Sequence, residues 1–87
     1  MEVEYMPEAI KDIQYFKRSG DKKLMKKIQS LIFEMQDSPK KGTGKPEQLK
    51  NNLSGYWSRR INREHRIVYK IDENRNIITI YSLRGHY

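Results

Sequence analysis

The hydrophobic periodicity of this 87-residue chain changes once, and that change restricts the fold more than any other feature. Residues 7–37 carry apolar side chains three and four positions apart, which is the spacing of amphipathic helices. Residues 56–81 alternate apolar and polar side chains, which is the spacing of half-buried strands. Helices followed by strands predict an α+β domain.

Two antiparallel helices are expected in the first part. Pro7 suits the first position of a helix, where its missing N–H costs nothing, and Gly20 suits a left-handed cap at the end. Asp21 is a good N-cap for a second helix, which ends at Ser38-Pro39. The apolar stripe of that helix is expected in the core. Residues 2–5 are also compatible with a short strand.

Three strands are expected at residues 56–61, 66–71 and 77–81. Because the turns between them are short, the strands should be sequential and antiparallel. The helix pair should cover one face of this small, mainly antiparallel, twisted sheet. Residues 1–87 give no sign of a second domain.

The alternation within the third run of strand-like residues decides which side chains face the helices. Ile67, Tyr69 and Ile71 suit the covered face, so Arg66 would project from the open face. A three-residue hairpin loop at 62–64 would place Arg60 directly opposite Arg66. Like charges in that position are destabilising. The pair is therefore either a tolerated surface accident or an anion site.

The composition favours a polyanion partner and excludes several classes. The formal net charge is +7, although solvated lysines would explain this equally well. The chain has no cysteine, which rules out disulfides and thiolate metal sites. No apolar run approaches the roughly 20 residues of a membrane span, and acids stand where a signal peptide would be basic. We expect a cytoplasmic protein without a membrane partner.

The segment 38–54 has no periodicity and is longer than a compact domain usually tolerates, which favours a functional loop over a passive connector. It carries Glu47. Aromatic residues in the strands add ring faces on which single-stranded RNA bases stack, with core packing as the alternative for each. These aromatic residues are Tyr56, Trp57, Tyr69 and Tyr81.

Glu47, Arg66 and His86 are of the types that metal-free RNA cleavage requires. The 2′-hydroxyl attacks the adjacent phosphorus, which needs a base, cations for the phosphate oxygens and an acid for the leaving 5′-oxygen. Glu47 can be the base and His86 the acid, since a histidine has an unperturbed pKa of about 6.5. No carboxylate cluster accompanies the two histidines, so neither a metal ion nor a cofactor is expected. A solvated glutamate and a frayed C-terminus are the plainer interpretations.

A long string of residues between 42 and 69, together with the terminal His86-Tyr87, matches a known family. The string contains Gly44-Lys45-Pro46-Glu47, Leu49-Lys50, Asn52-Leu53-Ser54-Gly55, Trp57-Ser58-Arg59-Arg60-Ile61 and Glu64-His65-Arg66-Ile67-Val68-Tyr69. It resembles the YoeB-type toxins of the RelE superfamily of bacterial toxin–antitoxin systems. Length, charge and element order agree over nearly the whole chain, which implies the RelE-like microbial RNase fold.

The resemblance implies an mRNA interferase, an endoribonuclease that cuts mRNA on translating ribosomes and inhibits translation. The residue matching Glu47 is the general base there, and the one matching Arg66 stabilises the transition state. The match to His86 is the general acid, and the match to Tyr87 shapes the site.

The resemblance also implies RNA contacts and partners. Lys50 and Arg60 match basic residues that steady the scissile phosphate. The implied protein partners are a YefM-type antitoxin and a second copy of the toxin, and operator DNA is bound only by the toxin–antitoxin complex. Thr43 and Gln48 depart from the family, where a basic residue and proline are common. Thr43 reduces the basicity expected of this loop.

Three other functions remain open from the sequence. The first is a non-catalytic DNA-binding module with the lysines of the second helix on phosphates, although such a module has no use for a fixed His-Tyr terminus. The second is a ribosome-binding inhibitor that blocks translation without cutting. The third is an inactive family member that serves as an interaction protein.

Overall fold

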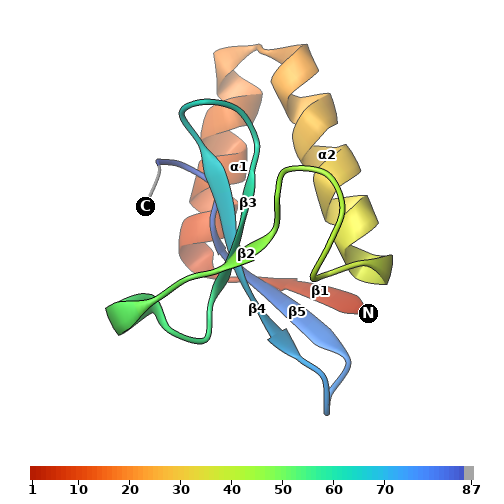
Figure 1. The fold of residues 1–87 in the computed structure, drawn as a ribbon. Coiled ribbons are helices and arrows are strands. Elements are labelled where there is room, and N and C mark those ends of the chain that lie inside the picture. The colour runs from red at the N-terminus through yellow and green to blue at the C-terminus, as the bar shows by residue number, and fades with distance from the viewer. Residues whose placement is uncertain (86–87) are drawn as a thin grey trace.

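The computed structural model describes residues 1–85, in which two helices lie against a five-stranded sheet. The elements are β1 (Glu2–Tyr5), α1 (Pro7–Ser19), α2 (Lys22–Asp37), β2 (Glu47–Gln48), the 3₁₀ helix η1 (Asn51–Leu53), β3 (Trp57–Arg60), β4 (Arg66–Asp72) and β5 (Ile77–Ser82). Figure 1 shows α1 and α2 as an antiparallel pair, which confirms the expected α+β class. Neither helix is long and apolar enough to cross a bilayer.

The helix boundaries follow the local signals in the sequence. Pro7 occupies the first turn of α1, and Gly20 ends that helix in the left-handed region, with φ of 77°. The Asp21 side chain accepts a hydrogen bond of 3.0 Å from the backbone N–H of Leu24, so it caps α2. The predicted caps at Gly20 and Asp21 are thereby confirmed.

The strand order is β1-β5-β4-β3-β2. β1 runs parallel to β5, and the other three pairings are antiparallel. The outer strand β2 corrects one expectation, because residues 47–48 were placed in a loop. The segment is too short to show a period, and its pairing with β3 is a long-range contact that no local pattern encodes.

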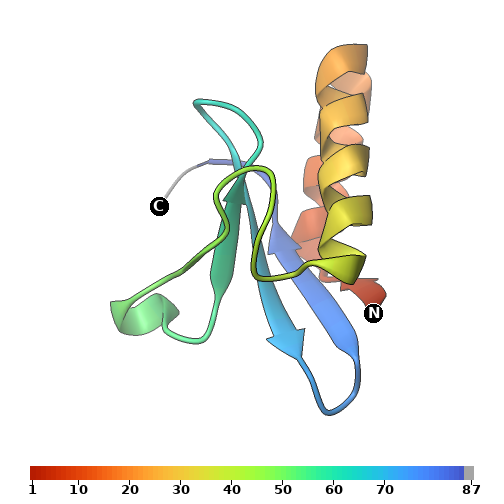
Figure 2. The same ribbon diagram turned by 45° about the vertical axis from the view of Figure 1, so that its right-hand side comes forward.

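One face of the sheet is covered by the two helices, as Figure 2 shows edge-on. Buried side chains of both helices, of β4 and β5, and of the residues directly after β3 and β5 form the core: Ala9, Phe16, Ile28, Leu31, Ile32, Met35, Ile61, Ile67, Tyr69, Ile78, Ile80 and Leu83. Tyr69 is fully buried, as its expected place on the covered face implies, so core packing and not RNA stacking is the correct interpretation of this ring. Its hydroxyl donates to the Pro39 carbonyl over 2.6 Å, and burial raises the pKa of Tyr69. Trp57 is half-buried and packs against the same core.

Candidate active site

The hairpin between β3 and β4 places two arginines opposite each other. Arg60 and Arg66 are register partners, as the three-residue loop predicted. The Asn62 side-chain oxygen accepts from the backbone N–H groups of Glu64 and His65, over 2.9 and 2.8 Å, and so shapes the loop. Both arginines belong to the face of the sheet that the helices leave open.

Glu47 joins this pair because β2 adds to the edge of β3. Glu47 is the register partner of Ser58, and directly opposite residues share a face. The Arg66 Nη1 donates to Glu47 Oε1 over 3.0 Å and to Ser58 Oγ over 3.2 Å. The Arg66 side chain is 17% exposed and the Glu47 side chain 56%, so the cation is held inside while the carboxylate meets solvent.

Ser58 was not given a role from the sequence, although alternation placed it on the same face as Arg60. It is fully buried, and its hydroxyl fixes the orientation of the Arg66 guanidinium. The signal for this role was its position on β3, two residues before Arg60 and therefore on the same face.

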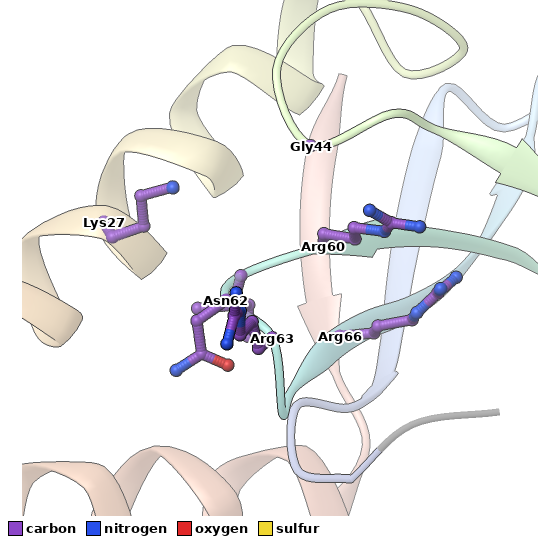
Figure 3. Close-up of a pocket in the computed structure, with 7 residues that line it drawn as sticks. Lys27, Gly44, Arg60, Asn62, Arg63 and Arg66 are labelled. Carbon is purple, nitrogen blue, oxygen red and sulfur yellow. The ribbon is translucent and has the colours of Figure 1, made fainter.

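A cleft of about 520 Å³ lies beside the arginine pair (Figure 3). Its described lining residues are Lys27, Gly44, Arg60, Ile61, Asn62, Arg63 and Arg66. Four of these are cations and none is an acid, so the cleft attracts anions. In Figure 3 the Arg60 and Arg66 side chains extend in the same direction from neighbouring strands.

Of the remaining predicted site residues, the structure describes only Lys50, and it does not line the cleft. Lys50 is exposed and directly precedes η1, outside the lining of the cleft. His86 and Tyr87 lie outside the described residues. The chain leads toward them through Gly85, whose carbonyl accepts a hydrogen bond of 3.0 Å from the Arg66 backbone N–H.

The Arg59 side chain lies on the covered face of the sheet, opposite to that of its neighbour Arg60. Its side chain is fully buried, and Nη1 pairs with Glu34 Oε1 of α2 over 3.2 Å. Nη2 donates to the carbonyls of Ser38 and Lys41, over 2.7 and 3.0 Å. We call Arg59, Glu34 and the loop groups they bind the Arg59 clamp. It fixes the loop that leads to Glu47, and sequence reasoning missed it, although alternation along β3 puts position 59 on the covered face.

The acid of the clamp has a perturbed pKa. The Thr43 backbone N–H donates to Glu34 Oε1 over 2.6 Å, and Arg59 adds a positive charge at the same oxygen. The Thr43 hydrogen bonds and, to a smaller extent, Arg59 hold the pKa of Glu34 below its ordinary value. The clamp is therefore assembled with the Glu34 side chain ionised.

Gly44 joins the end of this loop to β3. Its carbonyl accepts from the Arg60 N–H over 2.7 Å, and its φ is +88°. A Cβ at this position would lie 2.6 Å from Arg59 Cγ and 2.7 Å from the Arg60 carbonyl oxygen. Only glycine allows the loop to approach β3 this closely.

Two of the aromatic candidates remain on the open face. The rings of Tyr56 and Tyr81 meet edge to face, with centroids 4.8 Å apart, and the Lys70 ammonium lies 5.1 Å from the centre of the Tyr56 ring. Burial and then the neighbouring Tyr56 raise the pKa of Tyr81. Within residues 1–85, no group of three or more acidic or histidine side chains is arranged to hold a metal ion.

Residues 5–87 match the family described as the YoeB-like toxin of bacterial type II toxin–antitoxin systems. Toxin YoeB of Escherichia coli (strain K12) is 42% identical over 87 residues, with 100% of both chains covered. The chain belongs to the YoeB-like toxins. Toxin YoeB of Synechocystis sp. is 56% identical over 70 residues, which are 80% of this chain and 79% of that protein.

Solved structures of YoeB proteins share the whole fold. A YoeB/ParE toxin from Agrobacterium tumefaciens superposes with a TM-score of 0.93 at 36% identity, over 100% of both chains. YoeB in a heterotetrameric YoeB–YefM complex from Staphylococcus aureus gives 0.85 at 45% identity, over 100% of this chain and 98% of that one. The YoeB dimer from the same organism gives 0.87 at 45% identity, with the same coverage.

Proposed function

We propose that this YoeB-like toxin is a ribosome-dependent mRNA endoribonuclease that inhibits translation. The observation that carries the proposal is the hydrogen-bonded pair of Glu47 and Arg66, braced by Ser58, at the side of a cleft lined with cations. A carboxylate and a permanent cation on one open face are what attack by a ribose hydroxyl on a phosphate requires.

Glu47 is the general base and Arg66 the cation of the reaction. Glu47 removes the proton of the 2′-hydroxyl, whose oxygen then forms a bond to the adjacent phosphorus. Arg66 donates to the phosphate oxygens, on which negative charge builds up in the transition state. When the substrate enters, its phosphate replaces the Glu47 carboxylate as the partner of Arg66, which frees Glu47 to accept the proton.

The leaving group needs a proton when the bond from phosphorus to the 5′-oxygen breaks. His86 supplies it as general acid, and Tyr87 shapes the site around it. The products are a 2′,3′-cyclic phosphate and a 5′-hydroxyl, so the reaction consumes no water and uses no metal ion or cofactor. Arg60 steadies the scissile phosphate. Lys50, which stands outside the cleft, contacts a flanking phosphate instead.

The proposed partners follow from the relatives. A YefM-type antitoxin is the inhibitory partner, since the S. aureus relative is found in a complex with YefM. A homodimer is the free form, since that relative also forms a dimer. Operator DNA is bound only by the toxin–antitoxin complex. The protein acts in the cytoplasm, where ribosomes and mRNA meet.

The test is primer extension on mRNA bound to ribosomes and incubated with the purified protein. We expect new 5′ ends within the codon in the decoding site, and none when the same mRNA is free of ribosomes. A protein that only blocks the ribosome would stall translation and leave no new 5′ ends. That result would show that the protein inhibits translation by occupying the ribosome and not by cutting mRNA.

A further inference from the structure

Three consecutive backbone N–H groups after β5 are each held by a side chain. Asp12 Oδ2, from α1, accepts from Leu83 over 2.8 Å and from Arg84 over 3.3 Å. His65 Nδ1, just before β4, accepts from Gly85 over 2.9 Å. Asp12 is only 7% exposed, so a buried carboxylate is devoted to two main-chain groups of this segment.

The same segment is tied to the proposed active site by its backbone. The Gly85 carbonyl accepts from the Arg66 N–H over 3.0 Å. The Gly85 N–H thus donates to the His65 side chain. The Gly85 carbonyl accepts from the main-chain N–H of Arg66, the residue that follows His65. The chain reaches His86 immediately after this doubly bound glycine.

The state of the His65 ring follows from its hydrogen bond. A backbone N–H can only donate, so Nδ1 must be an unprotonated acceptor and the neutral ring carries its proton on Nε2. Nε2 lies 3.7 Å from a carboxylate oxygen of Glu64. The ring also packs edge-on against Phe16, with centroids 5.1 Å apart. His65 is therefore held in one orientation, with its acceptor turned toward Gly85.

We propose that His65 and Asp12 are positioning residues that set residues 83–85 against Arg66. They touch neither substrate nor phosphate. They fix residues 83–85, and through them the point from which the proposed acid His86 starts. This inference rests on the proposed function, because the anchoring of residues 83–85 affects catalysis only if His86 is the general acid. A small misplacement of a catalytic group is enough to cost about 10²-fold in rate.

Two substitutions separate the hydrogen bond of His65 from its packing. His65→Phe keeps a ring against Phe16 but has no acceptor for Gly85. His65→Asn loses the ring but keeps an oxygen at the same number of bonds from Cβ as Nδ1. Positioning predicts that His65→Phe lowers kcat about 10²-fold with KM unchanged, while His65→Asn stays close to wild type. If the His65 ring only packs against Phe16, His65→Phe should keep the wild-type melting temperature and activity, and His65→Asn should lose both.

Amide hydrogen exchange at Gly85 provides a readout that does not depend on catalysis. We expect protection of this amide in the wild-type protein and in His65→Asn, and its loss in His65→Phe. Full protection and full activity in His65→Phe would overturn the inference, as would equal losses in both variants. If the wild-type protein cut no RNA, the proposed function would fail. Loss of protection in His65→Phe alone would still support the anchoring of Gly85.

Discussion

The Glu47 carboxylate and the Arg66 guanidinium lie 3.0 Å apart, although 19 residues separate them in the sequence. They come from strands on either side of β3, whose Ser58 hydroxyl also accepts from Arg66. The cation of the proposed reaction therefore already has a counter-ion in the free protein. A substrate phosphate has to compete with Glu47 for it, which makes binding and catalysis separable by mutation.

Replacing Arg66 should remove transition-state stabilisation while leaving the fold intact. We expect Arg66→Ala to lower the single-turnover cleavage rate by about 10²–10³-fold. Arg66→Lys should recover only part of this, because an ammonium lacks the planar fork that holds Ser58 and a phosphate together. Arg75→Ala, in the exposed turn after β4, is the matched loss of charge and should cleave normally. Wild-type cleavage by Arg66→Ala would remove the assignment.

Replacing Glu47 should affect chemistry and binding in opposite directions. Glu47→Gln cannot accept the 2′-hydroxyl proton, so kcat should fall about 10²–10⁴-fold. Affinity for a short RNA should not fall, because a neutral amide competes less for Arg66 than a carboxylate does. Fluorescence anisotropy with a non-cleavable RNA, beside single-turnover rates, measures both. Weaker binding at an unchanged kcat would show that Glu47 is a binding residue instead.

Gly44 and Gly20 both have positive φ, but only one is crowded. Gly20→Ala meets no atom within 4 Å, so it should cost only the left-handed backbone penalty of about 1–2 kcal/mol. Gly44→Ala would place its Cβ 2.7 Å from the Arg60 carbonyl oxygen, so it should cost more and shift the loop that leads to Glu47. Urea unfolding compares the two variants. Equal costs would mean that the close approach of loop and β3 is not required.

Glu34 should make the fold sensitive to acid. Its pKa in the folded state is below the ordinary value of 4.5, so its ionised form adds stability above about that pH. This contribution is lost as the pH falls through the lowered pKa of the folded state. The difference in unfolding free energy between wild type and Glu34→Gln should therefore shrink in acid. A difference that is independent of pH would show that the Arg59 clamp does not depend on the charge of Glu34.

The parts of the fold that local patterns encode were predictable. Pro7, Gly20 and Asp21 mark the helix ends through their own backbone chemistry, and the hairpin loop fixes the pairing of Arg60 with Arg66. These features depend on residues close together in the sequence.

The parts of the fold that depend on contacts between distant residues could not be predicted from the sequence. The burial of Arg59 is stabilised by carbonyls of a loop about 20 residues away, and no rule for a charged residue on a strand predicts such partners. The strand β2 exists because β3 offers a free edge. The binding of Asp12 to the Leu83 N–H spans 71 residues. The sequence thus indicated the residues that are proposed to act, while the groups that orient them became visible only in the structure.

Substitution of a single 2′-hydroxyl in the mRNA tests the central claim most directly. The ribosome-bound message is prepared with a 2′-deoxy nucleotide on the 5′ side of the bond that the protein cuts. We predict no cleavage at that bond, and a 2′,3′-cyclic phosphate on the product of the unmodified message. Cleavage of the deoxy-substituted bond at the normal rate would contradict the account, because the nucleophile would then not be the ribose hydroxyl that Glu47 is proposed to activate.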